Sequence, residues 1–85
     1  MKTTLLAIKR LRGTIYYMDA GDALPMHTHD EATTHITIVA SGSVRIWGAW
    51  GEVTEHAPSV RNFVAGQPHE IVALEPTMLV AILTD

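Results

Sequence analysis

Short apolar segments separated by turn residues follow one another along the whole chain. None combines the length and the 3.6-residue period of an amphipathic helix, so the pattern predicts an all-β protein. Glycine, proline, serine and Asx residues stand between the segments, where the chain must reverse. We expect strands at residues 4–9, 14–19, 35–40, 44–50, 60–64, 70–74 and 78–84, with shorter ones at 26–29 and 52–55.

Strands this closely spaced favour a sandwich or barrel, and we expect one domain over residues 1–85 because the chain shows no repeat and no linker. Side chains alternate between the two faces of a strand, yet residues 78–83 are apolar at every position. Such a strand is typical of a sheet covered on both faces. Since no helix is expected, the cover must be another sheet of the chain or a second copy. We predict a homodimer.

Composition narrows the classes of function. The 85 residues are 47% hydrophobic and 18% charged, as in an ordinary globular protein, and contain no cysteine that could form a disulfide or act as a thiolate ligand. The net charge of -3 and the scattered basic residues exclude an extensive nucleic-acid-binding face. The apolar run near the N-terminus is too short for a signal peptide, and no segment is long enough to span a membrane. We therefore expect a cytoplasmic protein.

Four of the five histidines stand where a small barrel could bring them together. His27 and His29 are one residue apart, which on an extended strand places both imidazoles on one face, about 6.5–7 Å apart. His35 follows after five intervening residues, and His69 follows a turn that leads into the last hairpin. Any one of them alone is better explained as a polar surface or hydrogen-bonded core residue. The set of four predicts a site for one metal ion.

The spacing of these histidines resembles two motifs of the cupin superfamily: Gly21-x5-His27-x-His29-x5-His35-x6-Gly42, and Gly66-x2-His69. The resemblance covers the middle and C-terminal two-thirds of the chain. It implies a double-stranded β-helix, or jelly-roll barrel. In the family two histidines, a glutamate and a later histidine bind the metal. The resemblance therefore implies that His27, His29 and His69 are metal ligands.

The glutamate position of that family motif is occupied here by His35, as the distance to the following glycine shows. Glu31, in the connecting loop, is a weaker candidate for the same role. Four neutral imidazoles would leave a divalent ion with its full charge and make it a stronger Lewis acid. We expect zinc, iron, nickel, manganese or copper; imidazole ligands suit zinc, copper, iron and nickel, and affinity alone does not choose among the ions. Binding should weaken as pH falls through ~6.5, the reference pKa of histidine.

The resemblance implies a small metalloenzyme, of the oxygenase or isomerase type, that binds a small oxygen-rich molecule at the metal. Fold analogy does not select one reaction. The alternative is a non-enzymatic cupin binding module in which the metal mainly stabilises a small fold. A regulatory effector domain is a third possibility and would need a separate partner.

The fifth histidine and several aromatic and basic residues do not need a role in metal binding to explain them. His56 lies beside a predicted turn, and we expect it on the surface. Several aromatic and basic residues could line a pocket, although packing or exposure is the favoured explanation for each. They are Tyr16, Tyr17, Arg45, Trp47 and Trp50.

Overall fold

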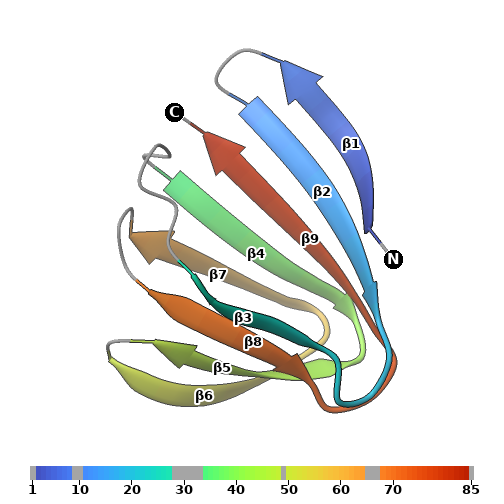
Figure 1. Ribbon diagram of the computed structural model, residues 1–85, viewed down its shortest axis with the longest axis vertical. Helices are drawn as coiled ribbons and strands as arrows, with labels where there is room; N and C mark the ends of the chain where they lie inside the picture. Colours follow the sequence, from blue (N-terminus) through green and yellow to red (C-terminus); the bar gives the residue numbers. More distant parts are fainter. Residues whose placement is uncertain (1, 9–10, 28–33, 49, 65–67, 85) are drawn as a thin grey trace.

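The computed structural model describes residues 2–8, 11–27, 34–48, 50–64 and 68–84, with side chains for 13–24, 35–48, 50–63 and 68–83 (Figure 1). Nine strands and no helix occur within these ranges. The described residues therefore contain no helix that could cross a membrane. The strands are β1 (Lys2–Ile8), β2 (Leu11–Met18), β3 (Ala23–His27), β4 (Thr34–Ser41), β5 (Ser43–Gly48), β6 (Gly51–His56), β7 (Ser59–Val64), β8 (His69–Ala73) and β9 (Thr77–Thr84).

Each strand predicted from the sequence has a counterpart in the structure, and the all-β prediction is confirmed. The boundaries move by a few residues. The strand expected at 44–50 stops at Gly48, and the chain turns before Gly51, whose φ of 119° is a conformation that glycine adopts without strain. The strand expected at 26–29 is observed at Ala23–His27, and residues 28 and 29 lie outside the described ranges.

The strands form two antiparallel sheets that face each other (Figure 1). The first sheet has five strands in the order β1-β2-β9-β4-β7, and the second has four in the order β3-β8-β5-β6. Hairpin neighbours in sequence, such as β5 and β6, pair directly, whereas β9 returns to lie between β2 and β4. One end of the barrel therefore gathers the end of β3, the start of β4, the end of β7 and the start of β8.

The core lies between the sheets and follows the alternation of each strand. In β9, Leu79 and Ala81 are buried, while Val80 and Ile82 on the opposite face are only partly covered. Within the described side chains, then, the chain itself covers one face of this sheet. The core cluster comprises Met18, Val39, Val44, Ile46, Phe63, Ile71, Ala73 and Leu79.

Gly42 joins β4 to β5 at the end of the barrel away from the histidines. Its φ is 86°, and a Cβ atom there would collide with the carbonyl oxygen of Pro76 and lie 2.8 Å from the Thr77 Cα. The same turn is held by hydrogen bonds from the Ala57 and Leu74 amides to the carbonyls of Gly42 and Ser43. Both the backbone conformation and the close approach require glycine.

We expect Gly42→Ala to lower the free energy of unfolding by about 3 kcal/mol, combining left-handed strain with overpacking. Gly21→Ala is the matched control, since Gly21 has a similar φ of 89° but nothing within 4 Å of the added Cβ. It should cost only about 1 kcal/mol. Urea unfolding of both variants measures the difference, and equal losses would show that the contact with Pro76 is unimportant.

Candidate metal centre

Three buried rings meet near the end of the barrel where β3, β4, β7 and β8 converge. His35 comes from β4 and Phe63 from the paired position of β7, both in the five-stranded sheet, while His69 opens β8 in the other sheet. Their residues are 5%, 2% and 1% exposed. The structure thus brings together two predicted ligands that are far apart in sequence and belong to opposite sheets.

The separation of the two imidazoles fits a shared ion. An imidazole nitrogen lies about 2.0–2.1 Å from a zinc ion, which puts the ring centre roughly 3.2 Å from the metal. Two such rings at angles of about 90–109° would have centres roughly 4.5–5.2 Å apart. The centroids of His35 and His69 are 4.9 Å apart, with the rings tilted by 46°. This spacing is compatible with two ligands of one ion.

Phe63 and Thr37 hold the two imidazoles in place. Phe63 stacks on His69 with ring centroids 4.3 Å apart and lies 5.3 Å from the centroid of His35. Stacking occupies a ring face, whereas nitrogen lone pairs lie in the ring plane, so the contact is compatible with metal binding. The Thr37 hydroxyl is 3.3 Å from Nε2 of His35. A hydrogen bond at one ring nitrogen is how proteins usually orient the other toward a metal.

The other predicted ligands are only partly within the described structure. The backbone of His27 pairs with that of His69 across β3 and β8, but its side chain lies outside the described residues. His29 and the alternative ligand Glu31 also lie outside them. Among the side chains that are described, no group of three or more histidine, cysteine, aspartate or glutamate residues could hold an ion. The described part of the proposed ligand set is the pair His35 and His69.

The remaining sequence candidates mostly face outward or are exposed, although Trp47 stands one residue before Gly48, which pairs with His69. His56 is exposed, as expected. Arg45 and Trp47 alternate with the buried residues of β5 and face outward, where the guanidinium lies 5.8 Å from the indole centroid. Tyr17 and Trp50 are 47% and 45% exposed. Tyr17 lines an open hollow at the opposite end of the molecule, and Trp50 lies against the guanidinium of Arg61.

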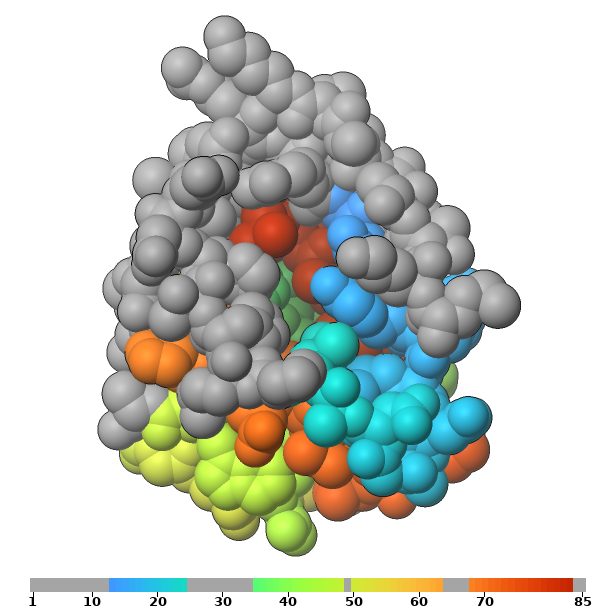
Figure 2. Space-filling model, in the orientation of Figure 1, coloured from blue at the N-terminus to red at the C-terminus, as the bar shows by residue number. Residues whose placement is uncertain are grey.

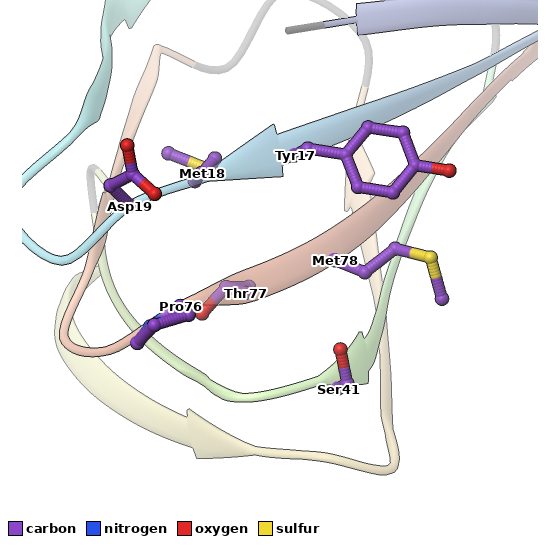
Figure 3. A pocket seen from close by; sticks show the side chains of 7 residues that line it. All are labelled: Tyr17, Met18, Asp19, Ser41, Pro76, Thr77 and Met78. Carbon is purple, nitrogen blue, oxygen red and sulfur yellow. The ribbon is translucent and has the colours of Figure 1, made fainter.

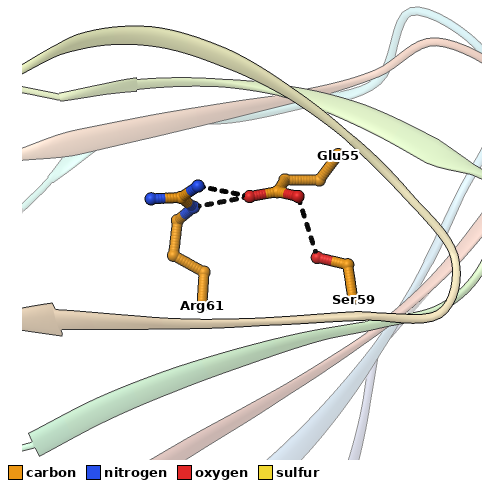
Figure 4. A network of polar contacts seen from close by, with 3 residues as sticks. All are labelled: Glu55, Ser59 and Arg61. Carbon is orange, nitrogen blue, oxygen red and sulfur yellow. Dashed lines mark hydrogen bonds and ion pairs between the residues drawn. The ribbon is translucent and has the colours of Figure 1, made fainter.

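Sequence reasoning missed an ion pair that ties the two sheets together at the β6–β7 corner. Glu55 of β6 accepts hydrogen bonds from Nε of Arg61 on β7, at 2.7 Å, and from its Nη2 (Figure 4). The Ser59 hydroxyl donates to the second carboxylate oxygen at 3.2 Å. The Arg61 guanidinium also lies 5.1 Å from the ring centroid of Trp50. The alternation of side chains along β6 and β7 predicts that Glu55 and Arg61 both face inward. Their contact also depends on the corner at which the chain passes from β6 in one sheet to β7 in the other.

Hollows are also seen in the part of the chain that the structure describes. In Figure 2, atoms of β9 and β4 are visible at the bottom of a depression bordered on one side by β2 and β3. A separate open hollow of about 330 Å³ lies at the end opposite the histidines (Figure 3). Its lining combines small, polar and sulfur-containing side chains: Tyr17, Met18, Asp19, Ser41, Pro76, Thr77 and Met78. The Thr77 hydroxyl there donates to backbone carbonyls of the chain, so this hollow resembles a turn region more than a binding site.

Solved structures share this architecture. A cupin superfamily protein from Desulfitobacterium hafniense matches 99% of the chain over 75% of its own length, with a TM-score of 0.92 and 12% identity. KdgF from Halomonas sp. matches 98% over 77%, with a TM-score of 0.90 and 17% identity. A conserved protein of unknown function from Streptococcus pyogenes matches 100% over 73%, with a TM-score of 0.90 and 19% identity.

At these identities the similarity concerns the fold, and the chain has the cupin fold that its histidine motifs predicted. No family model matches the sequence, and no curated protein matches it. Evidence for the predicted metal site, and for any activity, must therefore come from the residues of this chain itself.

Proposed function

We propose that the protein is a metal-binding cupin whose site is formed by His35 and His69 together with His27 and His29, and that it acts on a small oxygen-rich molecule as an oxygenase or isomerase. The observation that carries this proposal is the 4.9 Å separation of two buried imidazoles from opposite sheets. The paired backbones of His27 and His69 support a third ligand at the same place. Because all four proposed donors are neutral, a bound divalent transition metal would keep its full charge.

Each described residue has a distinct part in this function. A divalent ion, when bound, would supply Lewis-acid chemistry. His35 and His69 would hold the ion, and the Thr37 hydroxyl beside Nε2 of His35 would fix the orientation of that ring. Phe63 is 2% exposed and excludes water from one side of the imidazoles. A drier site strengthens every electrostatic interaction within it.

A structural metal is the second candidate function. It is favoured by the small size of the fold, since 85 residues without a disulfide bury a limited core. Four histidines can also complete a tetrahedral shell and leave no position for a substrate. The number and kind of ligands separate this function from catalysis.

The test begins with elemental analysis of protein purified without an affinity tag, for which we expect about one metal ion per chain. X-ray absorption at the edge of that metal then gives its ligands. A shell of nitrogen donors plus one or two exchangeable oxygen donors supports the enzyme. A closed shell of four nitrogen donors would refute catalysis at the metal, and protein without metal after incubation with each candidate ion would refute both functions.

A further inference from the structure

Three small residues form a layer on the inward face of the five-stranded sheet, next to the layer that holds His35. They are Thr14 of β2, Ala81 of β9 and Thr37 of β4, which stand at paired positions of these neighbouring strands. Thr37 and Ala81 are buried, and Thr14 alternates with Met18 of the core cluster. We call these three residues the small-residue layer.

The layers on either side of the small-residue layer contain large side chains. On one side, His35 and Phe63 stand at paired positions of β4 and β7. On the other side, Tyr16, Leu79 and Val39 stand at paired positions of β2, β9 and β4. Val39 is 1% exposed and Leu79 is 0% exposed, so this second layer closes the core. The small-residue layer therefore leaves room between the imidazole of His35 and a filled core.

Water reaches the small-residue layer although it faces inward. Ala81 is 8% exposed, whereas Leu79, two residues earlier on the same face of the same strand, is 0% exposed. Thr14 is also partly exposed. In the space-filling view, the depression with atoms of β9 and β4 at its bottom is bordered by β2, the strand of Thr14 (Figure 2). These observations point to an accessible hollow over Ala81, beside the proposed metal site.

The described side chains around this hollow carry no unpaired charge. Thr14 and Thr37 offer hydroxyl groups, and Ala81 offers a methyl group. The row of paired positions continues from Thr37 to Arg61, whose guanidinium is paired with the carboxylate of Glu55. A charged group placed in the hollow would lose hydration without gaining a partner. The hollow therefore favours an uncharged group.

We propose that the metal site binds a short α-hydroxy or α-oxo acid, whose oxygen atoms lie at the ion and whose uncharged tail lies over Ala81. This inference rests on the proposed function, because the ion holds the acid end of the molecule. An ion that keeps its full charge among neutral donors attracts an anionic chelating group. The small-residue layer is about 6.8 Å deep, of which the chelating group takes about 3 Å. With bonds of about 1.5 Å, the rest admits a tail of about two or three carbon atoms.

The test is a titration of the cobalt(II)-loaded protein with three α-hydroxy acids that differ only in the length of the tail. They are glycolate, α-hydroxybutyrate and α-hydroxyhexanoate, and the visible absorption of the cobalt ion reports the binding of each. We expect α-hydroxybutyrate to bind about 10-fold more tightly than glycolate, because its tail is buried over Ala81. The longer tail of α-hydroxyhexanoate should weaken binding at least 10-fold relative to α-hydroxybutyrate, because it meets the layer of Leu79.

Ala81→Leu fills the hollow and should weaken the binding of α-hydroxybutyrate about 10-fold or more. Glycolate has no tail and should bind this variant as it binds the wild type, which shows that the variant is folded and loaded with metal. The matched control is Ala40→Leu, the same change at an exposed position of β4 on the opposite face of the sheet. It should leave all three affinities unchanged.

Two results would overturn this inference while leaving the metal site in place. One is a wild-type protein that binds α-hydroxyhexanoate as tightly as α-hydroxybutyrate, or a loaded protein that binds none of the acids. The other is a folded Ala81→Leu protein whose affinity for α-hydroxybutyrate is unchanged; should this variant not fold, the wild-type series decides alone. A protein that takes up no cobalt would refute the proposed function, and this inference with it.

Discussion

His69→Ala is expected to reduce metal affinity by about 1,000-fold. Residues that merely orient a ligand typically contribute about 10–100-fold, and the loss of a ligand itself should cost more. His69 is 1% exposed, so its removal also leaves a buried void. Competition titration with a chromophoric chelator measures the dissociation constants of the variant and the wild type.

Two further variants make this experiment specific to the proposed site. His56→Ala removes an exposed histidine of β6 and should leave the affinity unchanged, which controls for adventitious binding. His35→Glu places a carboxylate where the cupin motif has one and should retain the metal, while His35→Ala should lose it. Equal losses for His69→Ala and His56→Ala, or unaltered binding by His69→Ala, would remove His69 from the ligand set.

Phe63→Ala is expected to destabilise the protein by about 3–5 kcal/mol, the usual cost of emptying a buried aromatic site. A chain of this length has a total stability of about 4–13 kcal/mol, so the loss could unfold much of the population. Phe63 is 2% exposed and belongs to the core cluster as well as to the ring contacts of His35 and His69. Thermal and urea unfolding at one fixed chain concentration measure the change.

Phe63→Leu separates packing from the contact with the imidazole. Leucine keeps most of the apolar volume, so its cost should be about 1–2 kcal/mol. It cannot stack on His69, however, and we expect metal affinity to fall by about 10-fold at nearly normal stability. If Phe63→Leu binds metal as tightly as the wild type, the aromatic ring has only a packing role.

Local chemistry explains how much of the fold could be predicted. The turn residues and the alternation of apolar positions are local features, so the sequence alone is enough to place the strands. The faces of β4 could be assigned in the same way, because His35, Thr37 and Val39 alternate with Ile36 and Ile38. The stop of β5 at Gly48 was missed, since Trp47 and Trp50 continue an apolar run beyond the turn.

Contacts between distant strands could not be predicted from local pattern. The histidine spacing suggested that His35 and His69 meet, but the stacking of Phe63 on His69 depends on how β7 and β8 of different sheets face each other. The pairing of Glu55 with Arg61 likewise depends on the corner between β6 and β7. The strand predicted to be apolar on both faces is β9, in which Leu79 and Ala81 are buried and Val80 and Ile82 are partly covered.

The most direct test of the central claim is a crystal structure of the metal-loaded protein with anomalous diffraction measured at the absorption edge of the metal. Our account predicts one strong anomalous peak per chain, about 2.0–2.2 Å from a nitrogen of His35 and from a nitrogen of His69. A loaded crystal in which the peak lies elsewhere, or contacts only one of these two imidazoles, would contradict it.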